Sequence, residues 1–204
     1  MRTQVFDIET IPAPESAYEA LAEQYELKRA KGQAVPATVD EYIASSGLMG
    51  EFGRIVCLAY ALDDEQTEVL WGDETEILTE FWKLAKDVKR FVGHNVFDFD
   101  FPFVYKRSRI LGVKPTQQLS FARYRNLPIY DTMREWSLWG RDSVSLHTLA
   151  RAFDLPTSKD AMDGSEVAGY FAAGKIEEIC TYCKKDVDLT RKVYRKMTFG
   201  ETYF

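Results

Sequence analysis

The order of strand and helix patterns along the chain limits its fold more than any other feature of the sequence. Residues 3–10 (TQVFDIET) alternate apolar and polar side chains, and two further strand patterns follow at 54–62 and 65–72, joined by an acidic turn. Beyond residue 73, helical periods alternate with short apolar strands. The elements expected there are helices at 74–88, 101–112, 143–156, 165–174 and 175–197 and strands at 89–95 and 127–132. Strands in series followed by alternating helices and strands predict one α/β domain over residues 1–204, with a sheet that is partly antiparallel.

A long excursion separates the first two strands. Residues 18–30 have a helical period, and a segment containing Gly and Pro follows before the second strand begins at residue 54. We interpret residues 16–50 as a variable insertion between the first and second strands.

Composition excludes several classes of protein. Of the 204 residues, 46% are hydrophobic, which is enough to bury one sizeable core. The apolar runs all fall short of the roughly 18 residues that suggest a membrane span, and the N-terminal MRTQVFDIET meets acids too early for a signal peptide. Three cysteines are an odd number that argues against a secreted disulfide framework. We therefore expect a cytoplasmic protein that does not associate with a membrane.

Charge is distributed unevenly along the chain, although the net charge is only −6. Residues 1–80 contain 17 Asp/Glu against 5 Lys/Arg, whereas residues 81–204 contain 15 against 21. Between Phe101 and Tyr130 there is no acid, and Tyr105, Phe121 and Tyr124 are interleaved with six Lys/Arg residues. This composition suits the binding of phosphates and the stacking of bases. A solvated helix face over core aromatic residues would produce the same pattern.

The first strand carries two carboxylates. Asp7 and Glu9 lie two positions apart, so their side chains share one face, while Phe6 and Ile8 point to the other face and into the core. Two acids on one face of a core strand repel each other unless a cation lies between them, and a hard divalent ion such as Mg²⁺ or Mn²⁺ prefers oxygen ligands of this kind. The alternative is an edge strand whose acids lie in water.

The last helix offers a second acidic position. Tyr182 and Asp186 are four residues apart and lie one turn apart on the same face, whereas Asp188 lies on a different face. A phenol above a carboxylate suits the orientation of a water held at that carboxylate. An ordinary half-buried tyrosine over a surface acid is the simpler interpretation.

Two aspartates in the segment VFDFDF, residues 96–101, pose a related question. Asp98 and Asp100 are two positions apart among three phenylalanines and a valine. An ionised carboxylate among aromatic rings is costly unless a cation accompanies it. Composition alone does not distinguish the two aspartates.

Taken in order, these segments resemble the motifs of the DEDD superfamily of 3′–5′ exonucleases. FDIET matches the first motif, GHNVFDFDFPFV is similar to the second, and YCKKD matches the third in the version with tyrosine that defines the DEDDy subgroup. The likeness is to the proofreading exonuclease domain of family B DNA polymerases and to stand-alone predicted exonucleases related to it. SLHTLARAFDLP, IYDTM and the run into the last helix also resemble that family, so the likeness covers almost the whole chain except residues 16–50.

The resemblance implies a ribonuclease H-like fold, a mixed β-sheet flanked by helices, and hydrolysis of phosphodiesters with two divalent cations, Mg²⁺ or Mn²⁺. Carried over to this sequence, it implies that four carboxylates hold the metals and that Tyr182 orients the attacking water. Asp100, rather than Asp98, falls at the motif's spacing from Asn95, so we expect Asp98 to be a helix-entry or solvent-facing acid. The implied metal ligands are Asp7, Glu9, Asp100 and Asp186.

The implied substrate is the 3′ end of single-stranded nucleic acid, with DNA favoured over RNA. An exonuclease that acts on RNA by the same mechanism and a non-catalytic nucleic-acid-binding module are the alternatives. The tyrosines Tyr18, Tyr25 and Tyr42 of the insertion suit either a rim that guides the strand or simple packing.

Other residues near the motifs have less specific interpretations. Thr10, Asn95 and Phe99 are candidates for contact with substrate, and Asn95 suits a brace for its loop equally well. His94 also could touch substrate, but a polar contact at a strand end is the favoured interpretation. Asp131 suits either an acid that supports the metal ligands or a helix cap. Cys180 and Cys183 form C-x-x-C without further ligands, which favours a thiol pair in or near the core.

Overall fold

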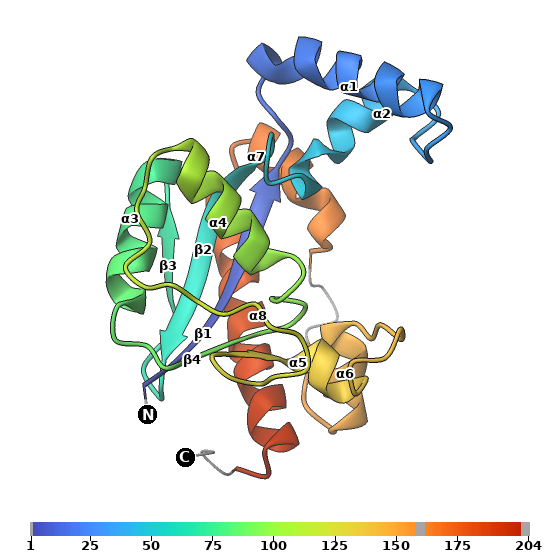
Figure 1. Cartoon of the computed structure of the whole chain (residues 1–204). Coiled ribbons are helices and arrows are strands. Elements are labelled where there is room, and N and C mark those ends of the chain that lie inside the picture. The colour runs from blue at the N-terminus through green and yellow to red at the C-terminus, as the bar shows by residue number, and fades with distance from the viewer. Residues whose placement is uncertain (1, 158–161, 201–204) are drawn as a thin grey trace.

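In the computed structural model, which describes residues 2–157 and 162–200, five strands form one mixed sheet. The strand order is β3-β2-β1-β4-β5, with β1 in the centre (Figure 1). β1 pairs antiparallel with β2 and parallel with β4, and β2 and β3 form an antiparallel hairpin. The predicted α/β class and partly antiparallel sheet are confirmed. The strands are β1 (Thr3–Ile11), β2 (Arg54–Leu62), β3 (Glu68–Trp71), β4 (Arg90–Gly93) and β5 (Ile129–Asp131).

Helices cover both faces of the sheet (Figure 1). Phe6 of β1 packs against Phe81 of α3 and Phe101 of α4, with ring centroids 5.1 and 4.8 Å apart. Val5 and Ile11 of β1 belong to a second core cluster, beneath α8. The alternation read from the sequence therefore separates two cores. The helices are α1 (Tyr18–Ala30), α2 (Val39–Ala44), α3 (Glu74–Ala85), α4 (Asp100–Ile110), α5 (Thr132–Trp136), α6 (Leu146–Ala152), α7 (Val167–Ala172) and α8 (Ile176–Met197).

Residues 16–50 contain a helical arm, α1 and α2, that projects beyond the C-terminal end of β1 (Figure 1). Leu21, Tyr25 and Tyr42 build a small core of their own. The Tyr42 hydroxyl donates to Gln24 Oε1 at 2.5 Å, and Tyr25 donates to the carbonyl oxygen of Ala37 at 3.0 Å. Two of the three tyrosines thus serve packing, and Tyr18 is 40% exposed.

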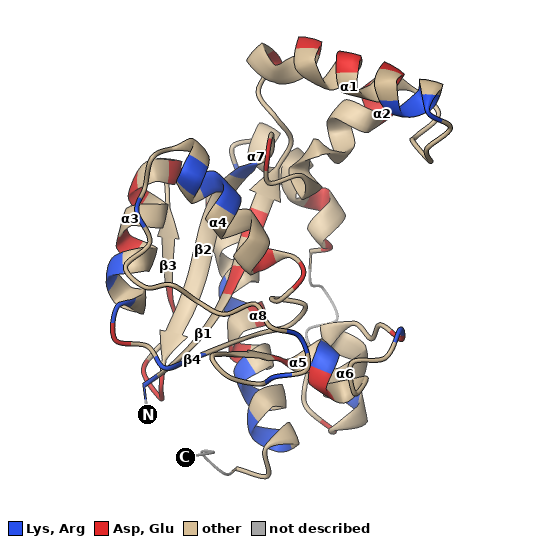
Figure 2. Ribbon diagram, in the orientation of Figure 1, with Lys and Arg blue, Asp and Glu red and all other residues tan. Residues whose placement is uncertain are grey.

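The charge asymmetry of the sequence is also an asymmetry in space. Acidic residues lie along α1, whereas basic residues gather on α4 and on the C-terminal half of α8 (Figure 2). Within the described ranges, none of the helices combines the length and the apolar character that crossing a membrane requires.

Candidate active site

The central strand places two carboxylates against α8. Asp7 and Glu9 point away from the core cluster that contains Phe6 and Ile8, as their spacing predicts. Glu9 is buried and Asp7 is half-buried. Cys183 of α8 joins them: its Sγ and one carboxylate oxygen of each acid all lie within 4.8 Å of one another.

Asp100 joins this group from the first position of α4. Its side chain is buried, with 3% exposure, and its Oδ1 accepts a hydrogen bond from the backbone N–H of Ile8 at 3.1 Å. The ring of the next residue, Phe101, packs against those of Phe6 and Phe91, with centroids 4.8 and 5.1 Å apart. Core packing of the phenylalanine therefore holds the preceding aspartate against β1.

Asp98 has the opposite environment. It is exposed and forms ion pairs with two arginines: Arg123 Nη2 lies 3.4 Å from Oδ1, and Arg134 Nε lies 2.6 Å from Oδ2. The expectation of a solvent-facing acid is confirmed. Its two arginine partners, from the loop before β5 and from α5, were not expected.

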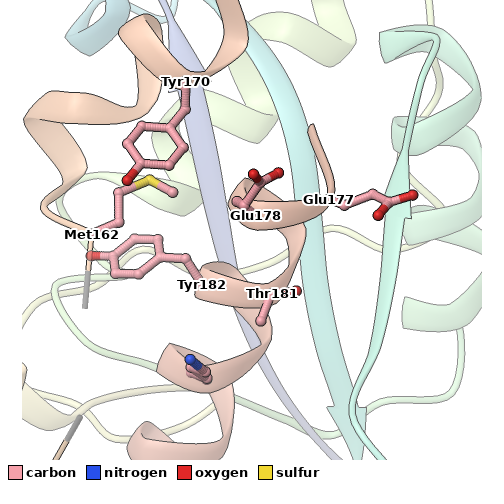
Figure 3. A pocket seen from close by; sticks show the side chains of 7 residues that line it. Met162, Tyr170, Glu177, Glu178, Thr181 and Tyr182 are labelled. Carbon is pink, nitrogen blue, oxygen red and sulfur yellow. The ribbon is translucent and has the colours of Figure 1, made fainter. Parts of the chain in front are cut away.

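Helix α8 contributes Tyr182 and Asp186, which are half-buried on one face. Beside Tyr182 lies a pocket of about 430 Å³, and the ring extends toward Met162, near Tyr170 (Figure 3). Asp188 points elsewhere, because it accepts hydrogen bonds from Thr67 at 2.5 Å and from Arg191 at 2.8 Å. The predicted division of α8 into two acidic faces is confirmed.

Burial raises the pKa of all four carboxylates, and charges of the other acids add to the shift at Asp7 and Glu9. Burial, and then the charges of Asp100, Glu9 and Asp186, hold the pKa of Asp7 well above its ordinary value. Burial and the charges of Asp186 and Asp100 do the same to the pKa of Glu9, and burial raises the pKa of Asp100 to about 7. Burial also raises the pKa of Asp186, although the Tyr182 hydroxyl and His147 oppose that shift. Burial and repulsion of this kind disfavour the ionised carboxylates unless cations balance their charge.

The donor set fits hard divalent cations. Carboxylate oxygens from three separate elements converge, and the structure shows no lysine or arginine ion pair to any of these four acids among the residues it describes. Oxygen ligands of this kind are preferred by Mg²⁺ and Mn²⁺. Cys183 has a different role from the carboxylates, because burial raises the pKa of its thiol and keeps it protonated. The protonated thiol donates a weak hydrogen bond to Asp7, with Sγ 3.5 Å from the carbonyl oxygen and from Oδ2.

Asp131 braces the loop that leads into α4. Its carboxylate accepts from the backbone N–H groups of Asn95 at 3.0 Å and Phe97 at 2.9 Å, and it also caps α5. Asn95 has a left-handed backbone with φ of 62°, which asparagine tolerates better than most residues. Asp131 is thus both a helix cap and a support for the loop that carries Asp100.

The other candidate residues have structural partners. Nε2 of His94 donates to the carbonyl oxygen of Val144 at 2.8 Å and Nδ1 lies 2.9 Å from the Thr132 hydroxyl, so His94 makes the favoured polar contact at a strand end. The Thr10 hydroxyl donates to the carbonyl oxygen of Gly47 at 2.7 Å, which ties β1 to the insertion. Phe99 precedes α4 and packs on Phe103, with centroids 5.7 Å apart. Contact of Thr10, His94, Asn95 or Phe99 with substrate stays a prediction.

Sequence reasoning missed two neighbours of the acidic group. Cys183 contacts Asp7 across 176 positions of sequence, and His147 of α6 lies close enough to Asp186 to lower its pKa. Neither residue stands in a motif that marks such contacts. The C-x-x-C cysteines are buried free thiols, as expected, and Cys57 of β2 is a third in the same core cluster.

Known proteins share both the sequence pattern and the fold. Residues 43–203 match a family described as a predicted 3′–5′ exonuclease related to the exonuclease domain of PolB. A DNA polymerase of Archaeoglobus fulgidus is 23% identical over 175 residues, which cover 77% of this chain and 22% of that polymerase. The family B DNA polymerase from the hyperthermophilic archaeon Pyrobaculum calidifontis is similar in structure, with a TM-score of 0.62 and 18% identity over 97% of this chain and 24% of that chain. The chain thus spans about a quarter or less of the polymerases it matches, and the expected ribonuclease H-like fold is confirmed.

Proposed function

Because this chain belongs to the family of predicted 3′–5′ exonucleases related to the exonuclease domain of PolB, we propose that it removes nucleotides from the 3′ ends of single-stranded nucleic acid, with DNA favoured over RNA. The observation that carries this proposal is the convergence of Asp7, Glu9, Asp100 and Asp186 from β1, α4 and α8. The preference for DNA rests on the likeness to DNA polymerases. Residues 16–50 would be an insertion in a single exonuclease domain, and most of them precede the stretch that matches the family.

The same four carboxylates are the proposed ligands of two divalent cations. When bound, such cations act as Lewis acids on a phosphodiester and lower the pKa of water. The buried N–H of Ile8 and the Cys183 thiol hold Asp100 and Asp7 in place by hydrogen bonds. Negative charge on the ligands then nearly balances the charge of two dications, which makes the cluster tolerable in a core.

Tyr182 is proposed to orient the attacking water. Burial and the nearby charge of Asp186 raise the pKa of its phenol, so the hydroxyl keeps its proton at neutral pH. It can therefore position a water by hydrogen bonding, and it cannot serve as a general base. The raised pKa thus supports the role that the DEDDy motif implies for Tyr182.

A strand-cleavage assay tests the proposed function. DNA and RNA oligonucleotides of one sequence, labelled at the 5′ end, are incubated with the protein and Mg²⁺ or Mn²⁺. We expect a ladder of products shortened from the 3′ end, faster on DNA, that disappears with chelator and with Asp7→Ala. Intact oligonucleotides of both kinds with both metals would refute the proposal and favour a non-catalytic binding module.

Metal binding should also stabilise the fold. At a cation concentration 100 times the Kd, binding to the folded state alone adds about 2.7 kcal/mol to the free energy of unfolding, or roughly 5–10 °C in Tm for a chain of this size. Differential scanning fluorimetry with Mn²⁺ and with Mg²⁺ measures the shift. A protein whose Tm is indifferent to both cations would contradict the assigned ligands.

The pH dependence of that shift follows from the raised carboxylate pKa values. Between the unfolded value near 4 and the raised folded value, which is about 7 for Asp100, the folded state binds more protons. The free energy of unfolding of the metal-free protein should therefore fall as pH rises through this window. Cations should accordingly raise Tm more at pH 8 than at pH 5.

A further inference from the structure

The acid-free segment 101–130 contains one aromatic ring that packing does not explain. Tyr105 packs on Trp82 and Phe121, and its hydroxyl donates to the carbonyl oxygen of Gln117 and accepts from the N–H of Leu119. Phe121 also contacts Phe97 and Phe101. These two rings are structural, whereas Tyr124 is 75% exposed.

Tyr124 is the outer end of an aromatic stack that begins at Phe97, in the segment that leads into α4. Its ring lies on Trp139, with centroids 5.5 Å apart, and Trp139 packs edge-on against the buried Phe97 at 5.2 Å. Phe97 precedes Asp100 by three residues, a chain length of at most about 11 Å. Trp139 is further held by a hydrogen bond from its Nε1 to Glu135 at 3.0 Å. The stack therefore connects one free aromatic face to the segment that leads into Asp100.

The backbone that presents this stack is strained. Tyr124, Leu138 and Trp139 have φ of 63°, 49° and 60°, values in the left-handed region that residues with a side chain rarely adopt. Each costs roughly 1–2 kcal/mol. Burial does not explain the strain at Leu138, which is 88% exposed, or at Tyr124, which is nearly as open, whereas Trp139 packs on Phe97. Strain of this kind gathers at binding and catalytic sites.

The surroundings of Tyr124 are positively charged. Arginines flank it on both sides in the sequence, and among the described residues no ion pair joins Arg125 to an acid. Arg123 forms an ion pair with Asp98, and Asp98 forms a second ion pair with Arg134. Two guanidinium groups are therefore held close to the start of α4. An aromatic face between cations complements a nucleobase and its phosphates.

We propose that Tyr124, supported by Trp139 and flanked by Arg123 and Arg125, is a stacking site for a nucleobase of the single strand, upstream of the 3′-terminal nucleotide. This inference rests on the proposed function, since it deepens the account of how that strand is held. Stacking on an aromatic face does not depend on base identity, so the site would hold any sequence. It would keep the strand aligned while its terminal nucleotide enters the acidic site.

Binding and cleavage are tested separately. In chelator, where no cleavage occurs, fluorescence anisotropy gives the Kd of a labelled single-stranded DNA, and 2-aminopurine placed at successive positions from the 3′ end reports stacking. We expect Tyr124→Ala to weaken binding about 5- to 150-fold and to abolish quenching at one internal position. Tyr124→Trp should retain both, and Trp71→Ala, which removes an exposed aromatic ring on β3, should bind as the unchanged protein does.

A substrate without an upstream base isolates the acidic site. The p-nitrophenyl ester of thymidine 5′-monophosphate should be hydrolysed equally by the unchanged protein and by Tyr124→Ala. A Kd for Tyr124→Ala within twofold of that of the unchanged protein overturns the inference. The inference also fails if Tyr124→Ala loses ester hydrolysis by the same factor as it loses DNA binding, because that result would show general damage to the fold. If the unchanged protein is a dimer that Tyr124→Ala dissociates, the stack is a protein contact and the inference fails. If the unchanged protein cleaves neither oligonucleotide nor ester, the proposed function fails, and the anisotropy measurement still decides the stacking site.

Discussion

Asp100→Asn is expected to reduce kcat for strand cleavage at least a thousandfold, whereas Asp98→Asn should leave it within about threefold. The amide keeps the size of the carboxylate and an oxygen that accepts the Ile8 N–H, so the change removes charge rather than packing. A bound metal ion supplies several kcal/mol of charge stabilisation to the transition state, and a loss of about 4 kcal/mol corresponds to a thousandfold in rate. Asp98 is exposed and bound to arginines, and its loss leaves the acidic site unchanged.

The free energy of unfolding distinguishes a lost ligand from a damaged fold. Without metal, Asp100→Asn should be at least as stable as the unchanged protein at pH 8, because it relieves the repulsion among the buried acids. Added Mn²⁺ should then raise its Tm less than it raises that of the unchanged protein. If Asp98→Asn abolished cleavage and Asp100→Asn spared it, the two assignments would be reversed.

Arg107→Met is expected to lower the free energy of unfolding by about 3–5 kcal/mol, the usual effect of removing one partner of a buried ion pair. Arg107 of α4 donates two hydrogen bonds to Glu74 at the start of α3, with Nε and Nη2 2.9 and 2.8 Å from its oxygens. The Ile55 N–H of β2 donates to the same carboxylate at 2.8 Å. Removal of the arginine leaves a nearly buried carboxylate without a cation, and α4 loses its tie to α3 and β2.

Urea unfolding monitored by circular dichroism measures this loss, and Lys83→Met provides the matched control. Lys83 pairs with Glu80 on the same α3, 3.1 Å apart, but that pair is exposed. Exposed pairs contribute about 0–1 kcal/mol, so Lys83→Met should change stability little. Equal effects of the two substitutions would show that burial of the Arg107–Glu74 pair is without consequence. The pair matters to the site because α4 begins with Asp100.

Much of the fold could be predicted because its signals are local. The alternation of TQVFDIET, the helical period of residues 18–30 and the Asp7/Glu9 spacing all depend on neighbours within a few residues. The structure forms β1 over Thr3–Ile11 and α1 over Tyr18–Ala30, where those patterns stand. Helix α2 has only six residues, which is too short for a helical period to show. Its capping box at Thr38 and Glu41 was the available signal.

Contacts between distant segments could not be read in this way. The bond from Ile8 to Asp100 spans 92 positions, and that from Cys183 to Asp7 spans 176. The part of Asp131 in bracing Asn95 and Phe97 depends on the parallel pairing of β4 with β5. These contacts follow from sheet order and helix packing, which a local pattern does not encode.

The sequence by itself determined which acids share a face, which aspartate of VFDFDF stands at the spacing of the exonuclease motif, and that aromatic residues alternate with cations before the fifth strand. Tertiary structure decided the environment of each group. It buried Asp100 next to Phe101 while pairing Asp98 with arginines, and it packed the rings of Tyr105 and Phe121 on each other while leaving Tyr124 75% exposed. The physical reason is that spacing along a strand or helix sets the direction of a side chain, whereas burial, charge balance and pKa depend on what packs against it from other elements.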